Sequence, residues 1–308
     1  MLKSFAKPAA LLALLAVAPA THAVIITAGP GQGATTDWSG VGQIIPTSPA
    51  GPNDFFGTGA LIAPTKVLTA AHVVDGLALN QVKFVFGGVE YVASAIAKHP
   101  SYTGTDEHDI AVVTLTQAVA NADVYHFDDG TLVPAGTGQV GYKVGFGVGG
   151  DGTTGATAAS AATYPYGTKR VARNTIDLIT TADTPVVDGR GNAYTLAPNL
   201  LAYDFDNHLT AAAGPLGAAA LGPDEGNTTV GDSGAPMLQW STAVGAYVIT
   251  GLSISGTDDF SRFGDIAFDT QVAAHSTWVA AQVPEPAALG ALTIAGATLL
   301  ARRRRTMR

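Results

Sequence analysis

The sequence lacks cysteine entirely and has few charged residues. Without cysteine, this chain of 308 residues forms no disulfide and no thiolate-ligated metal site. Only 13% of its residues are charged, and the net charge of −8 provides no basic surface of the kind that binds nucleic acid. The hydrophobic fraction of 47% is too high for a disordered chain, and the length allows one large domain or two small ones. We therefore expect a globular protein with a sizeable core and no covalent cross-links.

The first 23 residues have the organisation of a secretory signal peptide. Lys3 and Lys7 precede a short apolar run at 9–18, and the letters T-H-A at 21–23 complete a cleavage site. The alternative is an N-terminal anchor helix, but the run is shorter than the roughly 20 residues that span a membrane. We therefore predict that residues 1–23 are removed during export.

A second targeting pattern lies at the C-terminal end, at 283–308. The letters V-P-E-P (283–286) are followed by an apolar run at 287–301 and by four arginines, which would stay on the cytoplasmic side of a membrane. This pattern closely resembles the PEP-CTERM sorting signal of Gram-negative bacteria. The resemblance implies an exosortase-type partner, transient membrane anchoring, and release to the medium, the cell surface or the extracellular matrix. A simple tail anchor is the alternative.

Between these ends, residues 24–282 form the predicted folded domain. Short runs rich in β-branched residues recur between glycine-rich turns, which indicates an all-β sandwich or barrel. Long helices do not alternate with these runs, so a parallel α/β fold is disfavoured. One helix is expected at about 270–282. The stretches 147–163 and 211–222, rich in Gly and Ala, are predicted to be long surface loops.

The letters G-D-S-G at 231–234 suggest either a nucleophile or an ordinary turn. Gly, Asp and Ser are common in turns for backbone reasons alone. A nucleophilic Ser233 needs a general base, and the sequence has seven histidines. His72 and His108 are the best candidates, because both lie beside a strand-like run. Asp109, just before an apolar strand, is the candidate for the orienting acid, with Asp106 as a competitor.

Three segments in a fixed order carry a family resemblance. T-A-A-H (69–72), D-I-A-V-V-T-L (109–115) and G-D-S-G-A-P (231–236) resemble the signature segments of trypsin-like (chymotrypsin-fold) serine proteases. The resemblance covers roughly 24–280. It implies two six-stranded antiparallel β-barrels with a short C-terminal helix, and a secreted endopeptidase that acts on proteins or peptides.

The resemblance assigns roles around the candidate site. Ser233 would be the nucleophile, His72 its general base, and Asp109 the group that orients the histidine. The backbone N–H groups of Gly231 and Ser233 would form the oxyanion hole. Cleavage after residue 23 would leave Val24 as an apolar β-branched N-terminus, which in this family pairs with the acid before the nucleophile, here Asp232. The glycine pair that usually follows such a terminus is missing.

Substrate specificity is harder to derive. The resemblance places Asn227, an uncharged residue, at the floor of the primary pocket, and an ungapped alignment from the C-terminal tryptophan places Asp269 near a pocket wall. The letters G-L-S-I-S-G resemble the strand that pairs with substrate backbone, with Gly256 leaving the pocket mouth open. Ser253 or Ser255 would support the aspartate of the triad, or both are plain strand residues.

No cofactor is expected. Carboxylates cluster in Y-D-F-D-N (203–207) and P-D-E-G-N (223–227), which are suitable calcium ligands by their oxygen chemistry, but solvated loop acids are the simpler interpretation. Two further functions stay open beside the endopeptidase. One is a catalytically silent member of the fold that binds at the surface or in the matrix, and the other is an esterase with the same triad.

Overall fold

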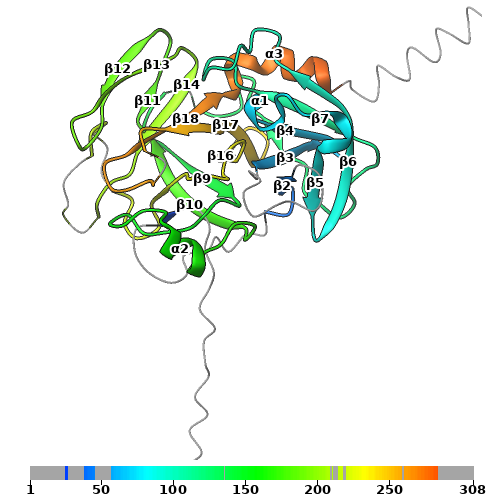
Figure 1. The fold of residues 1–308 in the computed structure, drawn as a ribbon. Coiled ribbons are helices and arrows are strands. Elements are labelled where there is room, and N and C mark those ends of the chain that lie inside the picture. The colour runs from blue at the N-terminus through cyan, green and yellow to red at the C-terminus, as the bar shows by residue number, and fades with distance from the viewer. Residues whose placement is uncertain are drawn as a thin grey trace, which may run out of the picture.

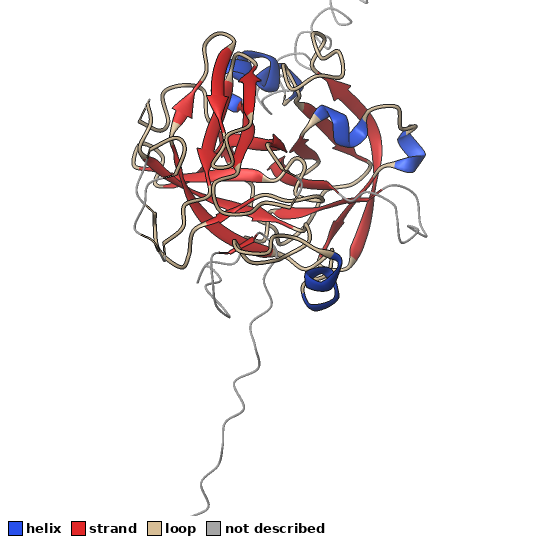
Figure 2. Cartoon of the chain, turned by 60° about the vertical axis from the view of Figure 1, so that its left-hand side comes forward, coloured by secondary structure: helices blue, strands red, loops and turns tan. Residues whose placement is uncertain are grey.

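Strands predominate over helices in the described chain (Figures 1 and 2). The computed structural model describes residues 25–26, 38–45, 57–134, 136–208, 210, 214–217, 220–258 and 260–283. The predicted signal peptide, Val24 and all but the first residue of the predicted sorting segment lie outside these residues. Within them, no helix is long and apolar enough to cross a membrane.

The first half of the fold is a closed six-stranded barrel, drawn in blue to cyan in Figure 1. Each strand of this barrel runs antiparallel to both of its neighbours. In barrel order its strands are β2 (Val41–Ile45), β3 (Gly57–Ala63), β4 (Lys66–Thr69), β7 (Ala111–Leu115), β6 (Val89–Lys98) and β5 (Lys83–Phe86). A short helix, α1 (Ala71–Val74), and a 3-10 turn, η1 (Leu79–Gln81), connect β4 to β5.

The second half is a curved eight-stranded sheet that forms a half-barrel. Its path is β10 (Arg170–Ile176), β9 (Gln139–Gly145), β16 (Pro236–Ser241), β17 (Ala246–Gly256), β18 (Ile266–Gln271), β14 (Leu200–Asp204) and β11 (Leu178–Ile179), with β8 (His126–Phe127) beside β17. Two small antiparallel pairs join β12 (Thr184–Val187) to β13 (Ala193–Leu196), and β1 (Ile25–Ile26) to β15 (Gly226–Asn227).

The predicted fold class is confirmed, with two refinements. The fold is a chymotrypsin-like double β-barrel in which only the first half closes with six strands. The predicted C-terminal helix is α3 (Val272–Gln282). The stretch 147–163, expected to be only loop, contains a short helix, α2 (Ala158–Thr163), because Thr157 and Ser160 cap its first turn reciprocally.

Two apolar layers explain why the sequence contains continuous apolar runs. Side chains alternate along a strand, so in β7 Val113 and Leu115 enter the core of the first barrel while Val112 faces the other way. Val112 joins a second cluster that includes Leu238 and Leu252 of the half-barrel. Full burial of each such side chain contributes about 1.5–3 kcal/mol. This shared cluster fixes the two halves against each other.

Candidate active site

His72 and Asp109 are joined on the first barrel. Strand β4 ends at the barrel rim, where the chain turns into α1, which carries His72. The Nδ1 atom of His72 lies 2.6 Å from Oδ2 of Asp109, and the backbone N–H of His72 donates to Oδ1 at 2.9 Å. Both carboxylate oxygens therefore hold the same residue, so the imidazole has a defined orientation and presents its Nε2 atom outward.

The second half of the fold also holds Asp109. The hydroxyl of Thr270, on β18, donates to the Asp109 backbone carbonyl at 2.8 Å. Asp109 is buried, whereas the competing candidate Asp106 is exposed. The preceding residue, His108, has a left-handed backbone with φ of 58°. The structure therefore pairs His72 with Asp109. The hydroxyl that supports residue 109 is that of Thr270, and no hydrogen bond among the described residues joins Asp109 to Ser253 or Ser255.

The other candidate base, His108, lies in a separate group of histidines. Its Nδ1 atom is 3.1 Å from Nε2 of His275, and its ring stacks on His99 with ring centroids 4.8 Å apart. His275 is a buried residue of α3. These contacts assign His108 to packing behind the site.

The turn that carries Ser233 is held from both halves of the fold. The Ser233 carbonyl accepts the N–H of Thr58, on β3, at 2.8 Å, while the Gly234 N–H donates to the carbonyl of Ser253, on β17, at 2.7 Å. Gly234 has a φ of +78°, and a Cβ at that position would lie 2.1 Å from Oγ1 of Thr69. Glycine is therefore required there both by backbone conformation and by space.

Two N–H groups of this turn are left free. The N–H of Asp232 donates to Thr229 and that of Ala235 donates to Asp232, at 3.0 and 2.7 Å. By contrast, no group among the described residues accepts a hydrogen bond from the N–H of Gly231 or Ser233. Gly231 has a φ of +98°, a conformation that favours glycine. These two donors line a cavity.

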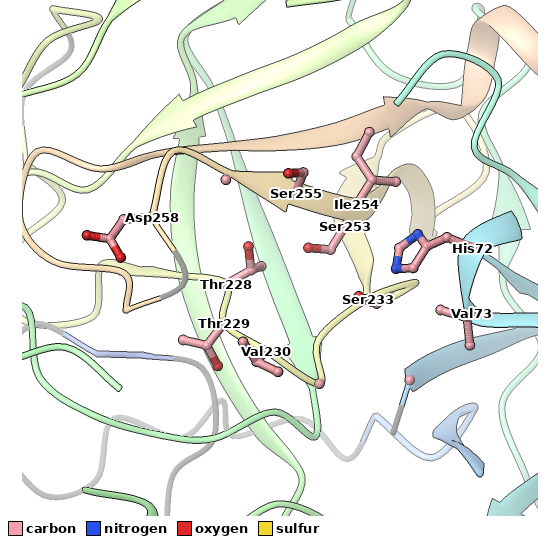
Figure 3. Close-up of a pocket in the computed structure, with 13 residues that line it drawn as sticks. His72, Val73, Thr228, Thr229, Val230, Ser233, Ser253, Ile254, Ser255 and Asp258 are labelled. Carbon is pink, nitrogen blue, oxygen red and sulfur yellow. The ribbon is translucent and has the colours of Figure 1, made fainter. Parts of the chain in front are cut away.

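That cavity has a volume of about 410 Å³ and lies between the two halves of the fold. Figure 3 shows the His72 ring pointing toward Ser233 from one side of it. Its walls are mostly hydroxyl-bearing and small apolar side chains, namely Thr228, Thr229, Val230, Ser253, Ile254 and Ser255. Ser253, Ser255 and Gly256, all on β17, line it.

Asn227 and Asp269 do not line the cavity, which corrects both sequence-based placements. Asn227 is buried beside β1, where it pairs with Ile25, and Thr228 takes the place at the wall. Asp269 is completely buried and binds Lys143 at 2.7 and 2.9 Å. No residue of β18 (Ile266–Gln271), the strand that carries Asp269, is among those that line this cavity.

The carboxylate that does line the cavity is Asp258. It lies at the end opposite His72 (Figure 3) and forms ion pairs with Arg262 and Arg190. Hydrogen bonds from the Phe260 backbone and from Arg262, together with these guanidinium charges, lower the pKa of Asp258 despite its partial burial. The sequence showed no signal for it, because Asp258 belongs to a loop whose course is set by distant residues.

Asp232, next to the nucleophile, is fully buried. Its carboxylate accepts the N–H groups of Gly147 and Thr229 at 2.8 and 3.0 Å. Burial raises the pKa of Asp232 to about 6, while these hydrogen bonds and the charges of Lys143 and Arg170 oppose the increase. The expected pairing with Val24 involves a residue outside the described part of the chain and stays a prediction.

Three of the four carboxylates at 203–207 and 223–227 are buried, contrary to expectation, whereas Asp224 is partly exposed and pairs with Arg173. Asp204, Asp206 and Glu225 are each at most 2% exposed, and the backbone N–H groups of Leu216, Gly214 and Leu221 donate to them. Among the residues the structure describes, no three or more His, Asp or Glu side chains are arranged to hold a metal ion.

Comparison with known proteins agrees with this geometry. A family model described as Trypsin matches residues 35–184, a range that contains His72 and Asp109 and ends before Ser233. No curated protein matches the chain. Together with the closed barrel and the half-barrel, the Trypsin match shows a trypsin-like serine protease fold.

Proposed function

We propose that this protein, a chain with the trypsin-like serine protease fold, is a secreted serine endopeptidase. The observation that carries the proposal is the pair His72–Asp109, 2.6 Å apart, whose histidine lines the same cavity as Ser233. The Trypsin match supports a serine protease hydrolase. The substrate is a protein or peptide, whose side chain would enter the cavity of about 410 Å³.

The reaction would proceed through an acyl-enzyme. His72 takes the proton of the Ser233 hydroxyl, which then attacks the carbonyl carbon of the scissile bond. Asp109 keeps the imidazole in the tautomer whose Nε2 accepts that proton, and it stabilises the imidazolium that forms. His72 next protonates the leaving amine, and the same base then activates a water molecule that hydrolyses the ester.

The oxyanion would be bound by the two free N–H groups of the turn. Gly231 and Ser233 both line the cavity, and neither N–H is used by another described residue. Loss of one such donor typically raises the barrier by about 2.7–4 kcal/mol. Glycine is required at the first of these donors, because Gly231 has a positive φ and a Cβ there would lie 2.5 Å from the Tyr166 ring.

Export and maturation complete the proposal. Removal of residues 1–23 would create the N-terminus at Val24, and its ammonium would then approach Asp232. The pairing of Ile25 and Ile26 with Asn227 and Gly226 supports this, because it brings the chain close to the nucleophile turn. Residues 283–308 would contact the membrane transiently before an exosortase-type enzyme of a Gram-negative bacterium removes them. Mass spectrometry of the secreted protein tests both ends, and a start well downstream of Val24 overturns the first.

Labelling by a fluorophosphonate probe tests the catalytic assignment. The mature protein should be labelled, and Ser233→Ala and His72→Ala should abolish labelling, while Ser255→Ala serves as a control from the same cavity. Wild-type protein that folds but is never labelled would indicate a silent binding protein. Hydrolysis of a nitrophenyl ester without cleavage of casein would indicate an esterase.

A further inference from the structure

A lysine and an aspartate form a completely buried ion pair behind the nucleophile turn. Lys143, on β9, donates to both oxygens of Asp269, on β18, and the Tyr203 hydroxyl, on β14, donates to Oδ1 of Asp269 at 3.0 Å. All three side chains are fully buried. Burial lowers the pKa of Lys143 and raises the pKa of Asp269, while their mutual attraction opposes both shifts.

Stability alone is a poor explanation for such a pair. Removing two charges from water costs several kcal/mol per ion, and a well-packed apolar pair often gives equal or greater stability. The role of the pair is therefore better sought in a further hydrogen bond of the Lys143 ammonium, which an apolar side chain could not form. The Lys143 ammonium has three N–H donors, and Asp269 accounts for two of its contacts.

The third contact reaches the turn that carries Ser233. The ammonium donates to the carbonyl of Ala235 at 3.1 Å, two residues after the nucleophile. The same carbonyl accepts the N–H of Ser253, on the strand that lines the cavity, at 2.9 Å. Lys143 therefore fixes the point where the nucleophile turn meets the cavity wall.

The pair also balances charge beside the turn. Asp232 is fully buried, and its carboxylate accepts N–H groups but contacts no cation among the described residues. Lys143 and the buried Arg170 are the cations whose charges act on it. Arg170 donates to the Gly147 carbonyl at 2.9 Å, and Gly147 in turn donates to Asp232. Two cations thus face two carboxylates around the turn.

We propose that Lys143 is a positioning residue for Ser233. Its ammonium is held by Asp269 and, through Asp269, by Tyr203. It anchors the Ala235 carbonyl and so fixes the positions of the nucleophile and the oxyanion donors relative to the cavity. This inference rests on the proposed endopeptidase function. It concerns the turn's geometry rather than substrate contact, because Lys143 is fully buried and does not line the cavity.

Removing the pair as a unit tests the proposal. Lys143→Met alone leaves a buried unpaired carboxylate and is expected to fold poorly. The double variant Lys143→Met/Asp269→Leu replaces the pair by apolar side chains and should fold. Its kcat and its rate of fluorophosphonate labelling should fall at least tenfold, while KM changes less than about threefold, since the cavity wall remains.

A matched control removes an ion pair far from the turn. Lys83 and Glu90 lie 2.6 Å apart on the outside of the first barrel, and Lys83→Met/Glu90→Leu should keep kcat and labelling within twofold of wild type. A folded Lys143→Met/Asp269→Leu variant with wild-type kcat overturns the proposal, as does a change confined to KM. Wild-type protein that shows no Ser233-dependent labelling overturns the proposed function instead.

Discussion

Replacing Asp109 by asparagine should remove most of the activity while leaving the fold intact. The carboxylate accepts the His72 N–H at 2.9 Å and the ring Nδ1–H at 2.6 Å. An asparagine of the same shape has one oxygen and one NH2 group. If its oxygen keeps the backbone hydrogen bond, the NH2 group faces Nδ1, which must then be the acceptor. The proton consequently moves to Nε2, and the imidazole no longer accepts the proton of Ser233.

The magnitude follows from this tautomer argument. The same substitution in a Ser-His-Asp triad lowers kcat by about 10⁴. At about 1.36 kcal/mol per factor of ten, the barrier rises by roughly 5.4 kcal/mol. The shape of the side chain is conserved and Thr270 holds the backbone carbonyl of residue 109, so the melting temperature should change by only a few degrees.

The assay is kcat on a peptide substrate together with the rate of fluorophosphonate labelling. Asp106→Asn is the matched control, because this exposed carboxylate lies three residues earlier on the same loop. It should behave as wild type. A folded Asp109→Asn variant within tenfold of wild-type kcat would refute the reasoning, and so would an equal loss in Asp106→Asn.

Three further predictions concern the turn, the cavity and the buried carboxylates. Gly234→Ala places a methyl group 2.1 Å from Oγ1 of Thr69 at a φ of +78°, so the rate of fluorophosphonate labelling should fall more than tenfold. Gly76→Ala is the control, because Gly76 has a similar φ of +70° but nothing within 4 Å of its Cβ. It measures the conformational cost alone, about 1–3 kcal/mol of stability. Asp258→Asn removes the negative charge from the cavity wall, while the positive charges of its partners Arg190 and Arg262 remain. In a panel of peptide substrates, the ratio of kcat/KM for cationic to neutral P1 side chains should therefore fall. An unchanged ratio contradicts the assignment of Asp258 to the substrate pocket. Burial raises the pKa of Asp177 to about 7 and that of Asp204 to about 6, so the folded state holds protons that the unfolded state releases near pH 4. The stability that these protons contribute is complete below pH 4 and is lost as pH rises toward 7; the melting temperature should fall over this range, and Asp204→Asn should flatten the slope.

Local sequence was sufficient for the parts of the site that depend on backbone conformation and chain order. The two glycines of G-D-S-G are required by the positive φ angles at Gly231 and Gly234, so the local sequence is enough to predict the turn. The nearly continuous apolar run at 111–115 follows from burial on both faces of β7. Histidine at the end of one such strand and aspartate at the start of another are likewise local signals.

The tertiary structure decided which distant groups meet. Lys143 and Asp269 are 126 residues apart, and nothing near either residue predicts their pairing. The same holds for Asp258, whose loop reaches the cavity while Asn227, closer in sequence to Ser233, turns into the interior beside β1. Acidic residues favour loops, so solvated side chains were the simpler interpretation of 203–207 and 223–227, yet Asp204, Asp206 and Glu225 are buried and accept backbone N–H groups. The sequence by itself determined the β-rich class, the order of the candidate triad and the glycines of its turn, because these depend on periodicity and local φ. Three features depend on contacts between strands far apart in the chain: the closure of one barrel and not the other, the residues of the cavity wall, and the Lys143–Asp269 ion pair behind the nucleophile. Only the folded structure could establish them.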